Sequence, residues 1–234
     1  MAVEAVIFDW GGTLSEFVPL DMVDVWTLAA RHLAPEREAE VAERLCAVEA
    51  RFWERTAGAC RSGTLADLVG EASAELGLDV AEAVLEEAAV RHLDAWTPHI
   101  RHHHDAAPTL AALRERGLRL GLLSNTHWPR NFHERFLERD GLAGLLDARL
   151  YTSETPHLKP HPSVFRAALD AVGVADPAAA VFVGDRPYDD VWGARRAGMR
   201  AVLMANDHAP AWDVTPDAVV SNLSELPPLV DGWR

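Results

Sequence analysis

Short, nearly continuous apolar runs recur along this chain and constrain its fold more than any other feature. They occupy residues 6–8, 118–123, 149–152, 180–183, 201–204 and 218–220. Apolar runs of this length are typical of strands that are buried on both faces of a parallel sheet. Helix-like segments separate several of them, such as the one that begins at Pro162 and stops at Gly173. The alternation predicts a doubly wound, Rossmann-like α/β core.

Residues 16–98 interrupt this alternation. The segment has no strand-like run, and its apolar residues repeat at helical spacing, as Val41, Leu45, Val48 and Phe52 do, and as Leu65, Leu68, Val69, Ala72 and Leu76 do. Thr64 with Asp67, and Asp79 with Glu82, have capping-box spacing and predict two helix starts. We therefore expect residues 16–98 to form an all-helical cap inserted after the first strand, with residues 1–15 and 99–234 forming the core.

Composition narrows the classes of partner. A chain of 234 residues with 49% hydrophobic content has enough apolar material for one full core. Its net charge of -14 argues against a nucleic-acid-binding surface and against binding to anionic membranes. No stretch approaches the roughly 20 apolar residues of a membrane span. No secretory signal is visible. The two cysteines, Cys46 and Cys60, are too few for a disulfide framework. We expect a cytoplasmic protein, and the sequence specifies no oligomeric state.

Chemically active residues gather where the predicted strands end. Ligands of open parallel sheets bind beyond the carboxyl ends of the strands. The residues that the sequence places at these ends, or in the turns that follow them, are Asp9, Ser124, Asn125, Asp185, Asp189 and Asp190. Lys159 precedes the helix at Pro162 and is the only lysine, since every other basic residue among the 22 is arginine. The topology predicts one crevice that contains acids, a hydroxyl and an amine.

Four short motifs in order give the chain a family resemblance. They are FDWGGTL, LLSNT, LKPHP and VGDRPYDD, and each lies at a predicted strand end or helix start. The sequence resembles the haloacid dehalogenase-like (HAD) hydrolases, mostly phosphatases, of the subgroup with a helical cap between the first and second motifs. The resemblance covers nearly the whole chain.

The resemblance implies a role for each motif residue. Asp9 would be the nucleophile that forms an aspartyl-phosphate, Ser124 and Asn125 would bind the phosphoryl group, and Lys159 would neutralise its charge. Mg²⁺ would be bound by Asp9, the backbone carbonyl of Gly11 and Asp185, with Asp190 in the outer shell. The donor types suit this chemistry, because Mg²⁺ prefers oxygen ligands and phosphoryl transfer needs positioning and charge neutralisation.

The first motif departs from the phosphatase pattern. In the family's phosphatases the residue two after the nucleophile is a second aspartate, which protonates the leaving group and later activates water; here it is Gly11. Glu16 and His127 follow the first and second motifs and are candidates for the missing acid. We expect a Mg²⁺-dependent hydrolase of a small phosphorylated metabolite, slowed or altered by Gly11. The alternative is a non-catalytic or regulatory protein that binds a phosphorylated ligand.

Two relatives of other chemistry fit less well. The dehalogenases also lack the second aspartate, but they replace the fourth-motif acids that this chain keeps as Asp185 and Asp190. The phosphonoacetaldehyde hydrolases have a similar first motif, but they need a lysine in the cap, and residues 16–98 contain none.

The histidines near the cap boundary and the bulky residues of the cap complete the candidates. His99 lies close to the run His102, His103 and His104, but adjacent side chains point in different directions and are not expected to bind one ion. Cap residues that could contact the distal part of a substrate are Arg51, Trp53, Arg55 and Arg61.

Overall fold

The chain folds around a six-stranded parallel sheet. The computed structural model describes residues 2–233, apart from the side chains of residues 55–57. The strands are β1 (Ala5–Phe8), β2 (Arg119–Ser124), β3 (Ala148–Tyr151), β4 (Ala180–Gly184), β5 (Arg200–Met204) and β6 (Ala218–Val220). Their order in the sheet is β3-β2-β1-β4-β5-β6, and every neighbouring pair is parallel. Each apolar run is thus confirmed as a strand, and the Rossmann-like α/β core is confirmed with them.

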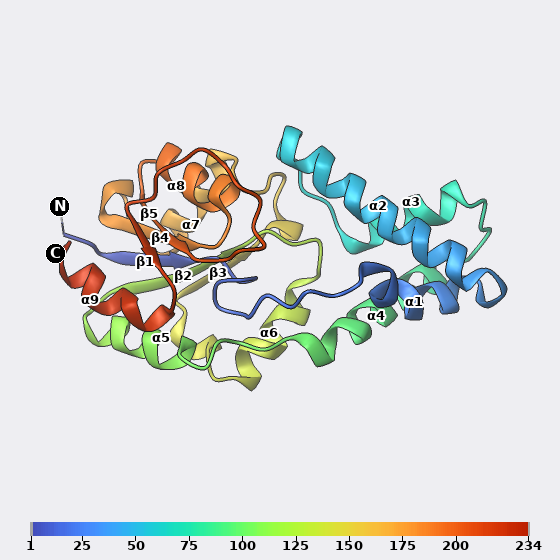
Figure 1. The fold of residues 1–234 in the computed structure, drawn as a ribbon, viewed down its shortest axis with the longest axis horizontal. Coiled ribbons are helices and arrows are strands. Elements are labelled where there is room, and N and C mark those ends of the chain that lie inside the picture. The colour runs from blue at the N-terminus through green and yellow to red at the C-terminus, as the bar shows by residue number, and fades with distance from the viewer. Residues whose placement is uncertain (1, 234) are drawn as a thin grey trace.

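Two helical layers bury the sheet (Figure 1). Val6 and Phe8 of the central strand face α5 (Ala106–Glu115), α6 (Arg130–Arg139) and α9 (Leu226–Asp231). Ala5 and Ile7 face α7 (Pro162–Ala171) and α8 (Gly193–Arg196) on the other side. All residues of β1 are fully buried, which explains why the run shows no apolar–polar alternation. The segment between β4 and β5 begins with a π-helical turn, Pro187–Trp192, that continues into α8.

A lobe of four helices follows β1. It contains α1 (Met22–Leu33), α2 (Glu38–Ala59), α3 (Leu65–Glu75) and α4 (Glu82–Trp96), and it lies to one side of the sheet (Figure 1). α1 packs between α2 and α4, while α3 contacts both of these helices. The helical cap after the first strand is therefore present, while the boundaries given to it above stay a prediction. We call this lobe the cap below.

The two predicted capping boxes had different outcomes. At the start of α3, the Thr64 hydroxyl accepts from the Asp67 backbone, and the Asp67 carboxylate accepts from the Thr64 backbone, as predicted. The prediction of a capping box at Asp79 was wrong. Helix α4 begins after Ala81, an extended residue that has no side-chain cap, so Asp79 lies too early to accept from the first turn.

Two adjacent chain segments connect the cap to the core. The backbone N–H of Glu16 donates to the Arg101 carbonyl, and that of His103 donates to the Leu14 carbonyl. The outgoing and returning segments are therefore hydrogen-bonded to each other. Within the described part of the chain, no helix has both the length and the apolarity to cross a membrane.

Candidate active site

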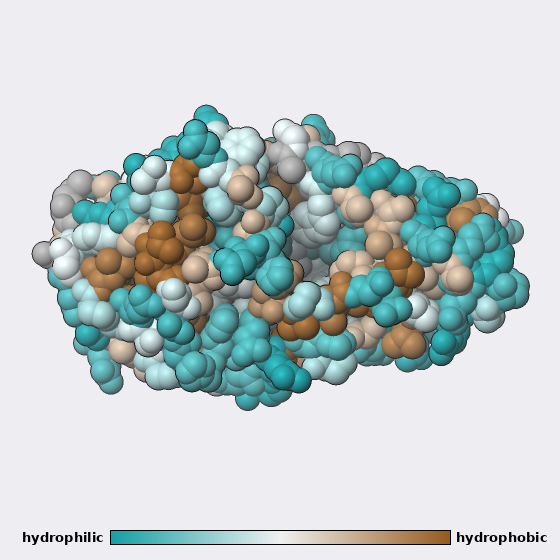
Figure 2. Space-filling view, in the orientation of Figure 1, coloured by the Kyte–Doolittle hydropathy of each residue, from teal (hydrophilic) through white to brown (hydrophobic). Residues whose placement is uncertain are grey.

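The carboxyl ends of the strands face a cavity between the core and the cap. The cavity has a volume of about 530 Å³, and the space-filling view shows a hollow between the two parts (Figure 2). Asp9 follows β1, Ser124 ends β2, and Asp185 follows β4; each lines the cavity and is at most 6% exposed. The structure thus brings together the residues that the motifs had singled out from distant parts of the sequence.

Lys159 is buried between two carboxylates. Its Nζ lies 2.6 Å from Asp9 Oδ1 and 2.7 Å from Asp190 Oδ1, and the residue is 1% exposed. Burial opposes the charge, but the attraction of Asp190 and Asp9 outweighs it and raises the pKa of Lys159 above its usual range. The chain's single lysine ammonium therefore remains a cation next to the predicted nucleophile.

Asn125 positions the loop that carries this lysine. Its side-chain oxygen accepts from the Lys159 backbone N–H at 2.8 Å, and its side-chain N–H donates to the Lys159 carbonyl at 3.0 Å. The amide predicted to bind phosphate is thus occupied with joining the second motif to the third. A phosphate contact from Asn125 would have to come from its backbone N–H and stays a proposal.

Three acids converge at the sheet edge. Asp9, Asp185 and Asp190 each offer a carboxylate oxygen, and these oxygens lie within 4.8 Å of one another. Burial raises the pKa of Asp9 to about 6 although Lys159 opposes the shift. Burial, with the charges of Asp9 and Asp190, raises the pKa of Asp185 to about 7. This charge distribution favours a bound cation.

The hydrogen bonds of Asp185 leave room for such an ion. Its Oδ2 accepts from the side chain of Asn206 at 2.6 Å, whereas its buried Oδ1 finds no partner among the described residues. Asn206 was not singled out from the sequence, although it follows the carboxyl end of β5 and so satisfies the same topological rule. An unpaired buried carboxylate oxygen fits the oxygen-seeking Mg²⁺ that was predicted here.

The two glycines of the first motif differ in what their backbones allow. Gly12 has a φ of +76°, and a Cβ there would lie 2.3 Å from Asp185 Oδ2, so only glycine fits. A Cβ at Gly11 would meet nothing within 4 Å, and the residue lines the cavity. The missing acid is therefore not a consequence of crowding.

Three other groups at the cavity could transfer protons. Glu16 is exposed on its wall. His127 is buried among cap residues, and burial lowers its pKa to about 3, so it is a neutral imidazole near pH 7. Asp189 was noted only as a turn residue, but it lines the cavity, and burial together with Asp190 raises its pKa to about 6. That value suits an acid–base group near neutral pH.

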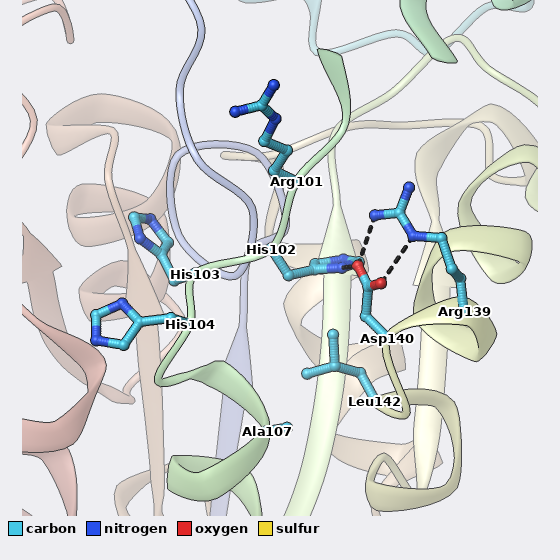
Figure 3. A pocket seen from close by; sticks show the side chains of 8 residues that line it. All are labelled: Arg101, His102, His103, His104, Ala107, Arg139, Asp140 and Leu142. Atoms are coloured by element: carbon cyan, nitrogen blue, oxygen red, sulfur yellow. Dashed lines mark hydrogen bonds and ion pairs between the residues drawn. The ribbon is translucent and has the colours of Figure 1, made fainter. Parts of the chain in front are cut away.

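The histidine run at the cap boundary does not converge on one point. His102 points toward Asp140, whereas His103 and His104 point the other way (Figure 3). The indole N–H of Trp10 donates to His102 Nε2 at 3.0 Å, so His102 Nδ1 carries the proton that bonds Asp140 at 2.6 Å. His102 therefore anchors Trp10, the residue next to Asp9, and the three adjacent histidines do not point toward a common centre.

The cap residues proposed for substrate contact are not equivalent. Trp53 lines the cavity. Arg51 instead pairs with Glu75 at 2.6 Å inside the cap. Arg61 makes an isolated backbone bridge to His157 and is exposed, while the Arg55 side chain lies outside the described residues.

Comparisons with known proteins identify the family of this chain. The family model of the haloacid dehalogenase-like hydrolases matches residues 3–198. The phosphoserine phosphatase of Thermus thermophilus is 41% identical over 52% of this chain and 48% of its own length. This chain thus spans about half the length of that relative.

Two further relatives represent other chemistries. The phosphonoacetaldehyde hydrolase of Bordetella avium is 32% identical over 86% of this chain and 70% of its own length. A solved 2-haloacid dehalogenase from Pseudomonas syringae superposes with a TM-score of 0.75 and 27% identity, covering 99% of this chain and 100% of that chain.

Proposed function

The chain belongs to the haloacid dehalogenase-like hydrolases, and we propose that it hydrolyses a small phosphorylated metabolite with Mg²⁺ through an aspartyl-phosphate at Asp9. One observation carries the proposal: the buried ammonium of Lys159 lies 2.6 Å from the carboxylate of Asp9, beside an unpaired oxygen of Asp185. A nucleophile, a fixed positive charge and a metal-binding oxygen thus meet at one end of the sheet.

Each residue contributes a defined part of the reaction. The carboxylate of Asp9 attacks phosphorus, and the bond to the leaving oxygen breaks; that oxygen takes its proton from solvent. Water then attacks phosphorus of the aspartyl-phosphate, which releases phosphate and restores Asp9. The hydroxyl of Ser124 and the ammonium of Lys159 hold the phosphoryl oxygens, whose negative charge must be neutralised. Asp9, Asp185 and the Gly11 carbonyl would hold Mg²⁺, which would supply further neutralisation. Asp190 accepts from both Lys159 Nζ and the Arg186 backbone, so it positions the lysine.

Gly11 determines which substrates this site handles well. Without a carboxylate there, the leaving oxygen departs without a proton from the usual position. General acid–base assistance is typically worth about 10²–10⁴-fold in rate. We infer that substrates with good leaving groups, such as acyl phosphates, react faster than alkyl phosphates.

The chemistries of the other two relatives fit this chain less well. The dehalogenase reaction needs no metal. In this chain the carboxylates of Asp9, Asp185 and Asp190 lie close enough together to bind one ion, which a dehalogenase would not require. A phosphonoacetaldehyde hydrolase needs a cap lysine for its Schiff base. The only lysine here is Lys159, which belongs to the core and is bonded to Asp9 and Asp190.

A second candidate function is binding of a phosphorylated ligand without turnover, and the glycine at position 11 is the observation that favours it. A screen of phosphate esters with and without Mg²⁺ separates the two, with Asp9→Asn as the blank. Mg²⁺-dependent release of phosphate by the wild type and not by Asp9→Asn is the expected result. Tight binding of phosphate esters without any release would support the binding protein instead.

A further inference from the structure

A second cluster of buried polar side chains lies where the cap meets the core. Glu49 comes from α2, His92 from α4, and His127 from the loop after β2 (Figure 1 shows these helices). The three residues are 7%, 0% and 4% exposed. Each offers one oxygen or nitrogen atom, and these atoms lie within 4.8 Å of one another. None of the three belongs to the acidic cluster at Asp9.

The histidines of this cluster are poorly satisfied by the residues that the structure describes. Neither ring nitrogen of His92 or of His127 completes a hydrogen bond within the described part of the chain. The backbone of Val25 makes a weak polar contact with one ring nitrogen of His92, which leaves the other for a further ligand. His127 Nε2 lies 3.4 Å from Glu49 Oε1, too far for a good bond. Unpaired buried polar groups cost about 1–3 kcal/mol each, so such a group needs an explanation.

Indole groups hold the cluster in place. The N–H of Trp26 donates to Glu49 Oε2 at 2.8 Å, and the Trp53 side chain also bonds this carboxylate. The Trp26 ring stacks on His92, with ring centroids 3.6 Å apart and planes 21° from parallel. Partners that orient a carboxylate and an imidazole in this way are typical of the residues surrounding metal ligands.

We propose that Glu49, His92 and His127 bind a divalent transition-metal ion of the Zn²⁺ class. One carboxylate and two imidazoles are a donor set of zinc sites that keep a fourth position open. Mg²⁺ prefers oxygen donors, so this site selects a different ion from the acids at Asp9 and Asp185. Coordination would give one nitrogen of each histidine the strong partner that the described residues do not supply.

The position of the site suggests what the ion contacts. Glu49 and His127 line the same cavity as Asp9 and Ser124, so an ion bound to them would lie at the wall of the space that a substrate would occupy. Two ligands come from the cap and one from the core, so the ion also joins these two parts. This inference is independent of the proposed phosphatase activity, since it requires no turnover.

The first experiment uses the wild type. Metal-stripped protein in excess Mg²⁺, which occupies the acids at the sheet edge, is titrated with Zn²⁺ by calorimetry. One zinc per chain should bind, and X-ray absorption of the zinc-loaded protein should show two imidazoles in the shell. A shell made only of oxygen atoms, or no binding under these conditions, would overturn the proposal even if no variant folds.

Variants then assign the ligands. Glu49→Gln keeps an acceptor for Trp26, and both it and His127→Asn should lose the zinc site. Trp26→Phe should weaken zinc binding about 10–100-fold, because it removes one of the two indole N–H groups that orient the Glu49 carboxylate and leaves the ligands themselves in place. Folding of each variant is verified by circular dichroism.

Two matched controls complete the design. Asp185→Asn removes a predicted Mg²⁺ ligand, and His133→Asn removes another buried histidine whose Nδ1 lacks a partner. Both should bind zinc as the wild type does. Undiminished zinc affinity in folded Glu49→Gln and His127→Asn, or its loss in Asp185→Asn, would refute the site.

Discussion

Placing an acid at position 11 should speed the phosphatase reaction proposed above. Gly11 lines the cavity, and a Cβ there would meet no atom within 4 Å. Its φ also lies outside the left-handed region, so the backbone accepts a side chain. The variant Gly11→Asp should therefore fold with a stability within about 1 kcal/mol of the wild type.

The expected gain follows from the proton that the new carboxylate provides. Acid–base assistance of about 10²–10⁴-fold corresponds to about 3–5 kcal/mol of barrier. The gain should be largest for alkyl phosphates and small for activated esters, whose leaving groups need no proton. Because Asp9 and Asp185 already crowd the site, the assay should be run at saturating Mg²⁺, which offsets the added negative charge.

The assay is steady-state phosphate release from an alkyl and an aryl phosphate by wild type, Gly11→Asp and Gly11→Asn. The asparagine variant has the same shape without the acid, so the comparison isolates proton transfer. Gly12→Ala is the negative control, because the clash of its Cβ with Asp185 should impair Mg²⁺ binding. If folded Gly11→Asp is no faster than Gly11→Asn on alkyl phosphates, another group already serves as the acid. Asp189→Asn would then be the next variant to measure.

Three further predictions address the ions and anions of the site. Calorimetric titration should show one Mg²⁺ site that Asp185→Ala loses, because the unpaired Oδ1 disappears; equal binding in both proteins contradicts the assignment. Vanadate with Mg²⁺ at 100 times its Kd should stabilise the wild type by about 2.7 kcal/mol in thermal melts, and Lys159→Met should abolish this gain unless the anion binds elsewhere. In metal-free buffer, the wild type should lose stability relative to Asp185→Asn as the pH rises from about 4 to about 7. The folded state there keeps a proton that the unfolded state releases, since burial raises the pKa of Asp185 to about 7. The free energies of unfolding of the two proteins, measured in urea, should diverge by at most about 1.4 kcal/mol per pH unit. The same pH dependence in both proteins would contradict the prediction.

The sheet was predictable from sequence because its signal is local. A strand buried on both faces must be apolar throughout, and each run therefore marked one strand. The motif residues Asp9, Ser124 and Asp185 were predictable because strand ends of a parallel sheet share one edge. The start of α3 was also predictable, because Thr64 and Asp67 interact within one helical turn.

Contacts between distant segments left no such local signal. Asn206 bonds Asp185 from another strand end, and the Asn125 amide is occupied by the Lys159 backbone. Glu49 lies on α2 and His92 on α4, and the sequence around each reads as that of an ordinary helix. Only the packing of the cap on the core brings them to His127.

The burial of Lys159 has a practical consequence for chemical labelling. It carries the only side-chain amine of the protein, and in the folded state this amine is 1% exposed and paired with two acids. Amine-directed dyes and cross-linkers should therefore leave the lysine of the folded protein unmodified, and immobilisation chemistry that relies on surface lysines should fail. Acylation of Lys159 would instead require the site to open. The rate at which the corresponding mass increase appears would therefore measure how often the cap moves away from the core.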